Sequence, residues 1–425
     1  MLQTLRNAWR IEEIRKKILF TLLIVLLYRI GNAIPVPFVN TALLQQYFAY
    51  LQNTALGLLD AMSGGSFSNA TIFALSIQPY INASIIIQLL CIAIPALERM
   101  SKEEGEEGRK KIASITRYST VAIGLLQGFG YYMLMKNNGI IVAEAAGSVW
   151  AAIIIILTFT SGSALIMWLG EQITEFGVGN GISIILFASI ISRFPNSVIT
   201  TIQNVANGSL AWWAAVLVFL GALALIVLIV FVNDAERRIP VQYAKRVVGR
   251  KMYGGQSTHL PMKVNMSGVM PIIFASSISS IPATIAAFTG HQNSAWAKTN
   301  TIPYAIIYLL LIIFFAYFYS TIQFNPIEVA NNLKKNGGYI PGFRPGKPTS
   351  EFIQKVLNKI TLFGAIYLGI ITITPILVSH FSNAAALTGL SLGGTSIIIV
   401  VGVALETVRA IEAQMLMRNY KGFLS

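Results

Sequence analysis

The stretch SIQPYINASIIIQLL, residues 76–90, decides which class of protein this sequence encodes. It lies within a long apolar segment, but it contains a proline at position 79 and four hydrogen-bonding side chains, those of Gln78, Asn82, Ser84 and Gln88. Polar side chains in a membrane-spanning helix normally face another helix or a water-filled cavity instead of lipid. We therefore expect a membrane helix that borders a polar seam or an aqueous path.

The composition indicates a polytopic, all-α membrane protein. Of the 425 residues, 55% are hydrophobic and only 11% are charged, whereas a soluble domain carries about 25% charged residues. The charged residues also occur in clumps between long apolar runs. The single cysteine, Cys91, lies in one of these runs, where a small apolar packing role is expected. A lone thiol forms no internal disulfide, so cysteine use does not indicate the redox compartment.

Ten segments have the length of a membrane span. The hydrocarbon core of a bilayer is about 30 Å thick and needs roughly 20 apolar residues of helix. This criterion selects residues 18–34, 70–97, 112–135, 148–170, 181–195, 211–233, 267–289, 302–322, 360–381 and 393–411. Only a short connection separates the fourth and fifth spans, which leaves the division of that pair open. The N-terminus lacks the features of a cleaved secretory signal, so the first span is expected to be retained.

The distribution of lysine and arginine predicts the orientation. With a cytosolic N-terminus, the segments expected on the inside are 1–17, 98–117, 171–180, 234–266, 323–359 and the tail from 409. These segments contain 27 of the 31 lysine and arginine residues. Because basic residues are enriched in cytoplasmic loops, the sequence predicts that both ends of the chain face the cytosol.

Two of the inside loops are longer than orientation alone requires. Residues 234–266 and 323–359 mix basic, aromatic, glycine and proline residues. Such loops can serve only to orient the protein and to contact anionic lipid headgroups. The same mixture also suits docking of a large partner, including one that contains RNA. Composition leaves both interpretations open.

The segment 53–69, NTALGLLDAMSGGSFSN, is mostly apolar before Gly64 and Gly65 and is too short to span a bilayer. Re-entrant segments typically have this length. Irregular backbone at membrane depth is tolerated only where it is buried in protein or lines a water-filled cavity. The alternative is an external loop with a small apolar patch.

The opening stretch divides into two stripes when its residues are placed about 100° apart on a helix. The first stripe combines aliphatic and polar residues: Ile77, Ile81, Ser84 and Gln88. The second stripe has only hydrogen-bonding residues: Thr71, Gln78 and Asn82. Polar residues in a span can serve simply as hydrogen bonds between helices. An aliphatic ring beside polar walls can also close a pore to ions, because water leaves a narrow apolar constriction. Pro79 is expected to let the helix bend between these faces.

Several other classes of membrane protein lack support in the sequence. Ion-coupled transporters usually carry acidic residues in mid-span, and the first nine spans contain almost none. Glu406 and Arg409 of the tenth span are three residues apart near its cytosolic end, where pairing and snorkelling cost little. Catalytic and metal-binding motifs are absent, and His259, His291 and His380 are far apart. We expect neither a cofactor nor a metal, so any transport would draw its energy from a partner.

Five blocks of sequence, taken together, point to a known family. They are FALSIQPYINASIIIQLL (73–90), MWLGEQITEFGVGNGISII (167–185), GGQSTHLPMKVNMSGVMPIIFASS (254–277), FNPIEVANNLKKNGGYIPGFRPGKPT (324–349) and GGTSIIIVV (393–401). These long and specific blocks closely resemble the SecY family, the channel subunits of the bacterial Sec protein translocase. The resemblance extends over essentially the whole chain.

The resemblance implies ten transmembrane helices in two pseudo-symmetric five-helix halves around an hourglass pore. The halves would be residues 18–195 and 211–411, joined by an external connection at 196–210, with a cytosolic N-terminus at 1–17 and a tail at 412–425. It also implies a ring of aliphatic side chains at the waist of the pore, which by motif position are Ile77, Ile81, Ile182, Leu186, Ile273 and Ile399. Leu186 departs mildly from an all-isoleucine ring.

The same resemblance assigns roles to other segments. The segment 53–69 resembles the plug that closes the outer funnel, with Leu58, Leu59, Met62, Gly64 and Gly65 as its candidate residues. A lateral gate would open toward lipid between the second and third helices and the seventh and eighth, with Gln78 and Asn82 near it. The two long basic loops resemble docking surfaces for a motor ATPase and the ribosome, with Arg344, Lys245, Arg246, Arg250, Lys334 and Lys335 as candidates.

The implied function is a protein-conducting channel of the bacterial plasma membrane. It would pass unfolded secretory polypeptides across the membrane and release signal sequences and transmembrane segments into lipid. The implied partners are the SecE and SecG subunits, the SecA motor ATPase, the ribosome, the signal-recognition-particle receptor, a YidC-type insertase, signal-bearing substrates and membrane lipids. The alternatives from other classes are a secondary transporter of a small solute and an intramembrane enzyme.

Overall fold

The structure is a computed structural model that describes residues 2–50, 55–102, 105–145, 147–208, 211–243, 246–248, 251–253, 257–288, 301–381 and 394–421. Ten helices of this described part correspond in order to the ten predicted spans. They are α2 (Glu12–Gly31), α5 (Gln78–Ala93), α7 (Gly105–Asn137), α8 (Val149–Phe176), α9 (Gly181–Ala206), α10 (Trp212–Asp234), α11 (Met270–Phe288), α12 (Ile302–Gln323), α14 (Lys347–Phe381) and α15 (Gly394–Lys421).

Length and apolar composition alone mark five helices of the described chain as able to cross a membrane. These are α8, α9, α10 and the helices that begin at Ile302 and Lys347, and two shorter apolar helices lie at Gln78–Ala93 and Met270–Pro282. α10 is the most lipid-like, since only 11% of its most apolar window is buried within the protein. The prediction of an all-α polytopic membrane protein is confirmed.

The second span differs from its prediction. Residues 70–77 form turns, and α5 begins only at Gln78, with Pro79 in its first turn. Proline is well suited to this position because its missing N–H would have no partner in the helix anyway. The predicted bend at Pro79 is therefore wrong, because the proline starts the helix instead of interrupting it. Thr71 lies outside the helix, so the hydrogen-bonding stripe reduces to Gln78 and Asn82.

Two further helix boundaries also differ from their predictions. α9 continues to Ala206, past the end expected for the fifth span, and α14 begins at Lys347, well before residue 360. Arg409 of α15 bonds α10: its Nη2 lies 2.5 Å from Oδ1 of Asp234 and donates to the carbonyl oxygen of Asn233 at 3.0 Å. The C-terminal end of α10 attracts a cation because its last carbonyl groups carry partial negative charge.

The long loops are more regular than composition indicated. β1 (Glu236–Tyr243) pairs antiparallel with β4 (Ser257–Lys263) and with β5 (Gly338–Tyr339), and β2 (Arg246–Val248) pairs with β3 (Lys251–Tyr253). The sheet has the order β4-β1-β5. Its buried residues, which include Ile239, Val241 and Met262, pack with the start of α14 in a separate hydrophobic cluster. The two basic loops thus form one folded unit.

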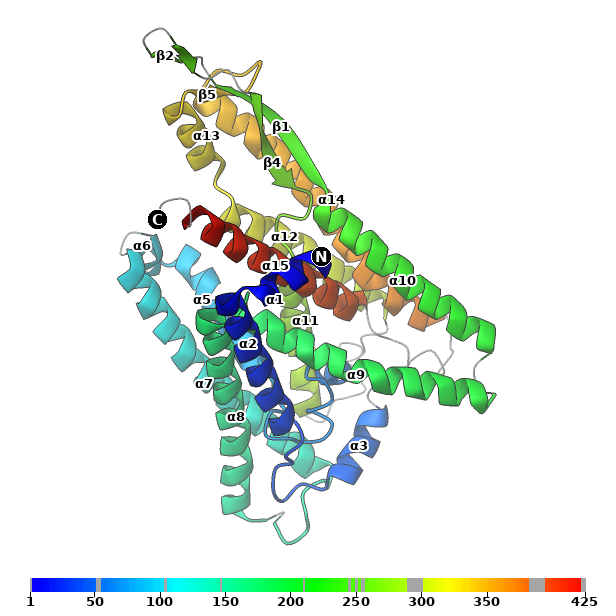
Figure 1. The fold of residues 1–425 in the computed structure, drawn as a ribbon. Helices are drawn as coiled ribbons and strands as arrows, with labels where there is room; N and C mark the ends of the chain where they lie inside the picture. Colours follow the sequence, from blue (N-terminus) through cyan, green and yellow to red (C-terminus); the bar gives the residue numbers. More distant parts are fainter. Residues whose placement is uncertain are drawn as a thin grey trace.

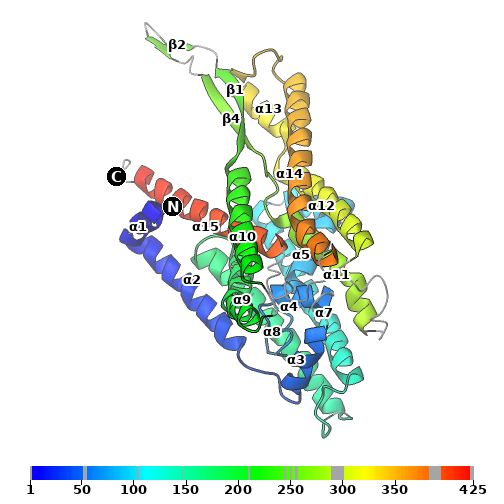
Figure 2. The same ribbon diagram turned by 90° about the vertical axis from the view of Figure 1, so that its right-hand side faces the viewer.

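Five short helices complete the fold: α1 (Leu2–Arg10), α3 (Thr41–Tyr50), α4 (Ala55–Met62), α6 (Pro95–Lys102) and α13 (Pro326–Lys335). The strands and α13 lie at one end of the molecule, and α3 lies toward the other (Figures 1 and 2). The strands and helix formed by the two long loops expected in the cytosol therefore project from the same end. The largest hydrophobic cluster lies between the helices and draws residues from α2, α5, α8, α9, α11, α12, α14 and α15.

Candidate functional site

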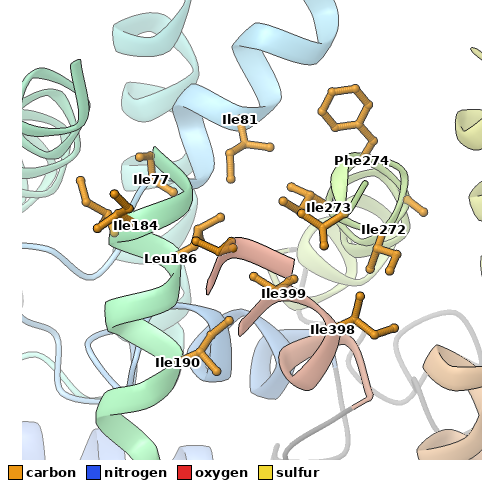
Figure 3. Close-up of a cluster of buried hydrophobic side chains, with 14 of the residues drawn as sticks. Ile77, Ile81, Ile184, Leu186, Ile190, Ile272, Ile273, Phe274, Ile398 and Ile399 are labelled. Atoms are coloured by element: carbon orange, nitrogen blue, oxygen red, sulfur yellow. The ribbon is translucent and has the colours of Figure 1, made fainter. Parts of the chain in front are cut away.

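The six aliphatic residues predicted as a ring belong to one hydrophobic cluster. Five of them, Ile77, Ile81, Leu186, Ile273 and Ile399, are buried, and Ile182 is half-buried and packs against the same cluster. Figure 3 shows Ile81, Leu186, Ile273 and Ile399 directed toward a common centre from four different helices. Residues more than 300 positions apart in the sequence are thus brought together.

Local structure explains why these side chains face inward. The Asn180 side chain caps α9 by accepting from the backbone N–H groups of Ile182 and Ser183, at 3.1 and 3.3 Å. This cap fixes where the helix begins. Leu186 follows Ile182 by four residues and therefore lies on the same side of α9. Ile77 precedes the first turn of α5 and Ile81 follows one turn later.

The cluster is larger than the predicted ring. Its other buried members include Ile184, Ile185, Ile190, Ile272, Phe274 and Ile398. The neighbouring isoleucines in ISIIL and GGTSIIIVV look alike as a sequence, so the sequence alone does not separate the side chains at the centre from those packed behind them.

The two predicted seam residues lie where the first five spans meet the last five. The Gln78 Nε2 of α5 donates to the Ser277 Oγ of α11 at 3.3 Å. Asn82, one turn further along α5, lines a cavity next to this contact. In contrast, Gln88 donates to Ser84 within α5 itself at 3.2 Å. The polar residues of the opening stretch therefore divide into a contact between helices and a contact within one helix.

A cavity of about 570 Å³ lies beside this seam. Its walls come from α4 and the turns after it, α5, α7, α9 and α11, and most are apolar. Gln78, Asn82 and Gln127 add amide groups. The wall from α7, formed by Ile123, Leu126, Gln127 and Tyr131, was not predicted, because nothing local in that helix marks these residues as lining a cavity.

The segment predicted as a plug is a short helix followed by tight turns. α4 covers Ala55–Met62, and Leu59 and Met62 line the cavity. Leu58 lies in α4, but its side chain is outside the described part, as are residues 51–54. Gly64 and Gly65 follow with φ of +72° and +86°, a conformation that favours glycine.

The residues predicted to dock partners are only partly described. Arg344, Lys334 and Lys335 are exposed. Lys334 and Lys335 end α13, and Arg344 lies in the loop between β5 and α14; α13 and β5 belong to the projecting end of the molecule (Figure 1). Thr349 Oγ1 donates to the Arg344 carbonyl oxygen at 2.8 Å, and Phe343 stacks on Phe352 with ring centroids 4.2 Å apart. These contacts hold the loop that presents Arg344. Arg246 lies in β2 with its side chain outside the described part, and Lys245 and Arg250 lie wholly outside it.

The sequence matches the profile of the SecY family over residues 71–408. Among its relatives, the protein translocase subunit SecY of Streptomyces galbus is 44% identical over 440 residues, and that of Mycobacterium bovis is 43% identical over 448 residues. Both matches cover the whole of this chain and the whole of the relative.

The chain belongs to the SecY family.

Solved structures of the SecY and Sec61 channels share its fold. A protein-conducting channel superposes with a TM-score of 0.65 at 16% identity and covers 95% of this chain and 93% of its own. Canine Sec61, solved in a ribosome–channel complex, superposes with a TM-score of 0.62 at 16% identity, with the same coverage. The prediction of a protein-conducting channel is confirmed, and these comparisons give no support to the solute-transporter alternative.

Membership of the SecY family also places the protein in a membrane, as a multi-pass protein. The roles of individual residues are a separate question, because the comparisons assign none of them. Geometry therefore carries any role assigned to the six aliphatic residues, to the α5–α11 seam and to α4.

Proposed function

We propose that unfolded polypeptides cross this channel through the aliphatic cluster at its centre. The observation that carries this proposal is the convergence of Ile81, Leu186, Ile273 and Ile399 from α5, α9, α11 and α15. Branched aliphatic side chains exclude water from a narrow constriction. Their contacts are non-directional, so they can close around an extended chain of any sequence. Ile77 and Ile182 would complete this ring.

We propose further that the two halves, residues 18–195 and 211–411, part to open the channel. Two of their contacts support this division. Gln78 of the first half bonds Ser277 of the second, and Leu186 and Ile399 face the same centre from opposite halves. Opening between α5 and α11 would join the pore to the apolar cavity beside the seam. An apolar signal or transmembrane segment could then leave for lipid according to the apolar area that it buries.

Residues 55–65 would act as the plug on the outer side of the ring. α4 and its glycine turn lie beside the cavity, and Leu59 and Met62 contribute apolar side chains to it. In one solved SecY structure with this fold, the plug domain is described as stabilising the closed state of the channel and maintaining a membrane seal. The position of α4 supports the same role in this chain.

The exposed basic residues of the two long loops would bind the partner that supplies energy for transport. Arg344, Lys334 and Lys335 stand on a folded unit that projects from the helices, and Lys245, Arg246 and Arg250 belong to the same loops. Canine Sec61 and yeast Ssh1 were solved in complexes with ribosomes. For this chain we expect a ribosome, a SecA-type motor ATPase, SecE and SecG subunits, the signal-recognition-particle receptor and a YidC-type insertase as partners.

The distribution of basic residues supports a bacterial plasma membrane orientation with both termini in the cytosol. The strands of the loop 234–266 and α13 of the loop 323–359 project from the same end of the structure (Figure 1). Substituted cysteines at the chain ends and at residue 138 should differ in their access to a membrane-impermeant thiol reagent added to whole cells.

Reconstitution tests the proposed function. Liposomes would contain the full chain with its SecE-type partner, and the motor ATPase, ATP and an unfolded signal-bearing protein would be added outside. Import of the substrate into a protease-protected space is expected only when all components are present. Uptake of a small solute without any polypeptide transport would contradict the proposal.

A further inference from the structure

An ion pair joins α4 to α9. The Asp60 Oδ2 of α4 lies 3.1 Å from the Arg193 Nη1 of α9. The Asp60 side chain is 7% exposed, whereas that of Arg193 is 39% exposed. The second carboxylate oxygen of Asp60 accepts a hydrogen bond from the Ser68 backbone N–H at 2.7 Å. A buried negative charge therefore relies on a cation that solvent can reach.

The backbone of the glycine turn approaches the same face of α9. A Cβ atom placed on Gly64 would lie 2.7 Å from the Ser189 carbonyl oxygen, closer than real Cβ contacts allow. It would also lie 3.0 Å from the Ser192 Oγ. Ser189, Ser192 and Arg193 are three and four residues apart, so they share one face of α9. This face receives the turn that follows α4.

The other end of the segment is attached differently. The Phe67 ring stacks on Tyr131 of α7 with centroids 4.1 Å apart and meets Phe48 of α3 edge-on at 5.3 Å. The Tyr131 hydroxyl donates to the Phe67 carbonyl oxygen. Beyond it, the Val36 N–H donates to the Ala70 carbonyl oxygen at 2.9 Å. Aromatic packing and backbone hydrogen bonds thus fix residues 67–70.

These two attachments differ in strength and in chemistry. The contacts of Phe67 are apolar and buried, so salt does not weaken them, whereas a partly exposed ion pair is weakened by screening. Gly64 and Gly65, both with positive φ, lie between the two attachments. Glycine permits large backbone rotations that other residues resist. The segment therefore has one end fixed by apolar packing and another that depends on an ion pair, with Gly64 and Gly65 between them. Leu56 of α4 is also buried, in the cluster that contains Phe67, and the Gly65 N–H donates to the Asp60 carbonyl oxygen at 3.0 Å.

We propose that Asp60 and Arg193 form a latch that holds α4 in place, and that α4 is released by rotation about Gly64 and Gly65 while Phe67 stays fixed. This inference rests on the proposal that residues 55–65 close the channel. Removing one partner of a buried ion pair leaves the other charge uncompensated and is destabilising. The closed position of α4 should therefore fail when either charge is removed.

The test measures the efflux of a neutral sugar from liposomes that contain the full chain and its SecE-type partner, without substrate. Asp60→Asn and Arg193→Gln should each raise the efflux rate about tenfold, which corresponds to about 1.4 kcal/mol. Asparagine can still accept the bond from Ser68, so the change isolates the charge. The double variant should leak no faster than the faster single variant, because both changes remove one interaction. Lys136→Gln, an exposed basic residue at the far end of α7, is the matched control and should leave efflux unchanged.

A covalent bridge distinguishes the latch from a general loss of folding. Asp60→Cys with Arg193→Cys, in a Cys91→Ala background, should leak until a bifunctional thiol reagent joins the two positions, and bridging should then restore the resting rate. Deletion of residues 57–65 separates this inference from the plug itself. If the deletion variant leaks but the Asp60 and Arg193 single variants do not, the proposed latch is wrong and the proposed plug still stands. If the deletion variant does not leak, both the proposed latch and the proposed plug are wrong.

Discussion

The Gln78 amide in α5 donates to the Ser277 hydroxyl in α11 across 3.3 Å, and these residues are 199 positions apart in the sequence. The bond is half-buried and borders an apolar cavity. A neutral hydrogen bond contributes about 1 kcal/mol net. The proposed gate is thus closed by a weak polar contact where an apolar contact would hold it more firmly.

Replacing both seam residues with leucine, Gln78→Leu with Asn82→Leu, should make the gate harder to open. Fully burying a leucine side chain contributes about 1.5–3 kcal/mol, more than the hydrogen bond that is lost. We expect export of a substrate with a shortened apolar signal to fall about tenfold, while a strongly apolar signal is little affected. Export into vesicles with a graded series of signals measures this.

Gln88→Leu is the matched control for the seam variant. Gln88 lies on the same helix, but it bonds Ser84 of that helix and not α11. Its replacement should leave the signal requirement unchanged. If the seam variant accepted the whole series of signals as the unaltered protein does, Gln78 and Asn82 would have no part in gating.

Shortening side chains of the ring should open the resting channel to ions. Ile81→Gly with Ile273→Gly removes two buried aliphatic side chains from the common centre, so water can enter the constriction. The expected result is a measurable ion current in vesicles at rest. Ile155→Gly, at an equally buried position of the second hydrophobic cluster, should destabilise the protein similarly without a current. Tight vesicles carrying the ring variant would count against the ring.

Gly64 and Gly139 form a matched pair of glycines with similar backbone conformation. Their φ angles are +72° and +66°, but only at Gly64 would an added Cβ meet a neighbour, the Ser189 carbonyl oxygen at 2.7 Å; nothing lies within 4 Å at Gly139. Gly64→Ala should therefore push the turn away from α9 and increase resting sugar efflux, and Gly139→Ala should not. Equal efflux from both variants would mean that the approach of Gly64 to α9 does not hold the channel closed.

Reversing the charge of Arg344 should block export that depends on the motor ATPase. Arg344 is exposed in the loop between β5 and α14, so Arg344→Glu should leave the fold and the amount of protein in the membrane unchanged. Lys359→Glu, an exposed basic residue further along α14, is the control. The measurement is the rate of motor-dependent export with equal amounts of each variant. Normal export by Arg344→Glu would show that this residue is not part of the docking surface.

The long apolar spans could be predicted closely from the sequence, because their composition alone selects the helix. The predictions for spans 211–233 and 302–322 match α10 and α12 to within one residue at each end. The span 70–97 was too long at its start, because an apolar composition does not distinguish a helix from buried turns. Ser76, just before α5, has a φ of +50°. Nothing in the local sequence FALSI predicts this backbone conformation.

Contacts between distant segments could not be predicted. The strand β1, ERRIPVQY, contains a proline and three charged residues. These residues make the alternation of buried and exposed positions around Ile239 and Val241 hard to recognise in the sequence. The pairing of Asp60 with Arg193 joins residues 133 positions apart, and nothing near either residue indicates its partner. Ile77 and Ile81 were predicted from the stripe in the opening stretch, whereas the other four ring residues were predicted only from the family resemblance, because their neighbours have the same composition.

The central claim is that an extended polypeptide crosses between Ile81, Leu186, Ile273 and Ile399. A photoreactive amino acid would replace each of these residues in turn, and Ile155 as a control, in the reconstituted channel with a substrate stalled during export. We predict cross-links from the four central positions to the stalled chain and none from position 155. A stalled chain that cross-links elsewhere in the protein and to none of the four would contradict the proposed path.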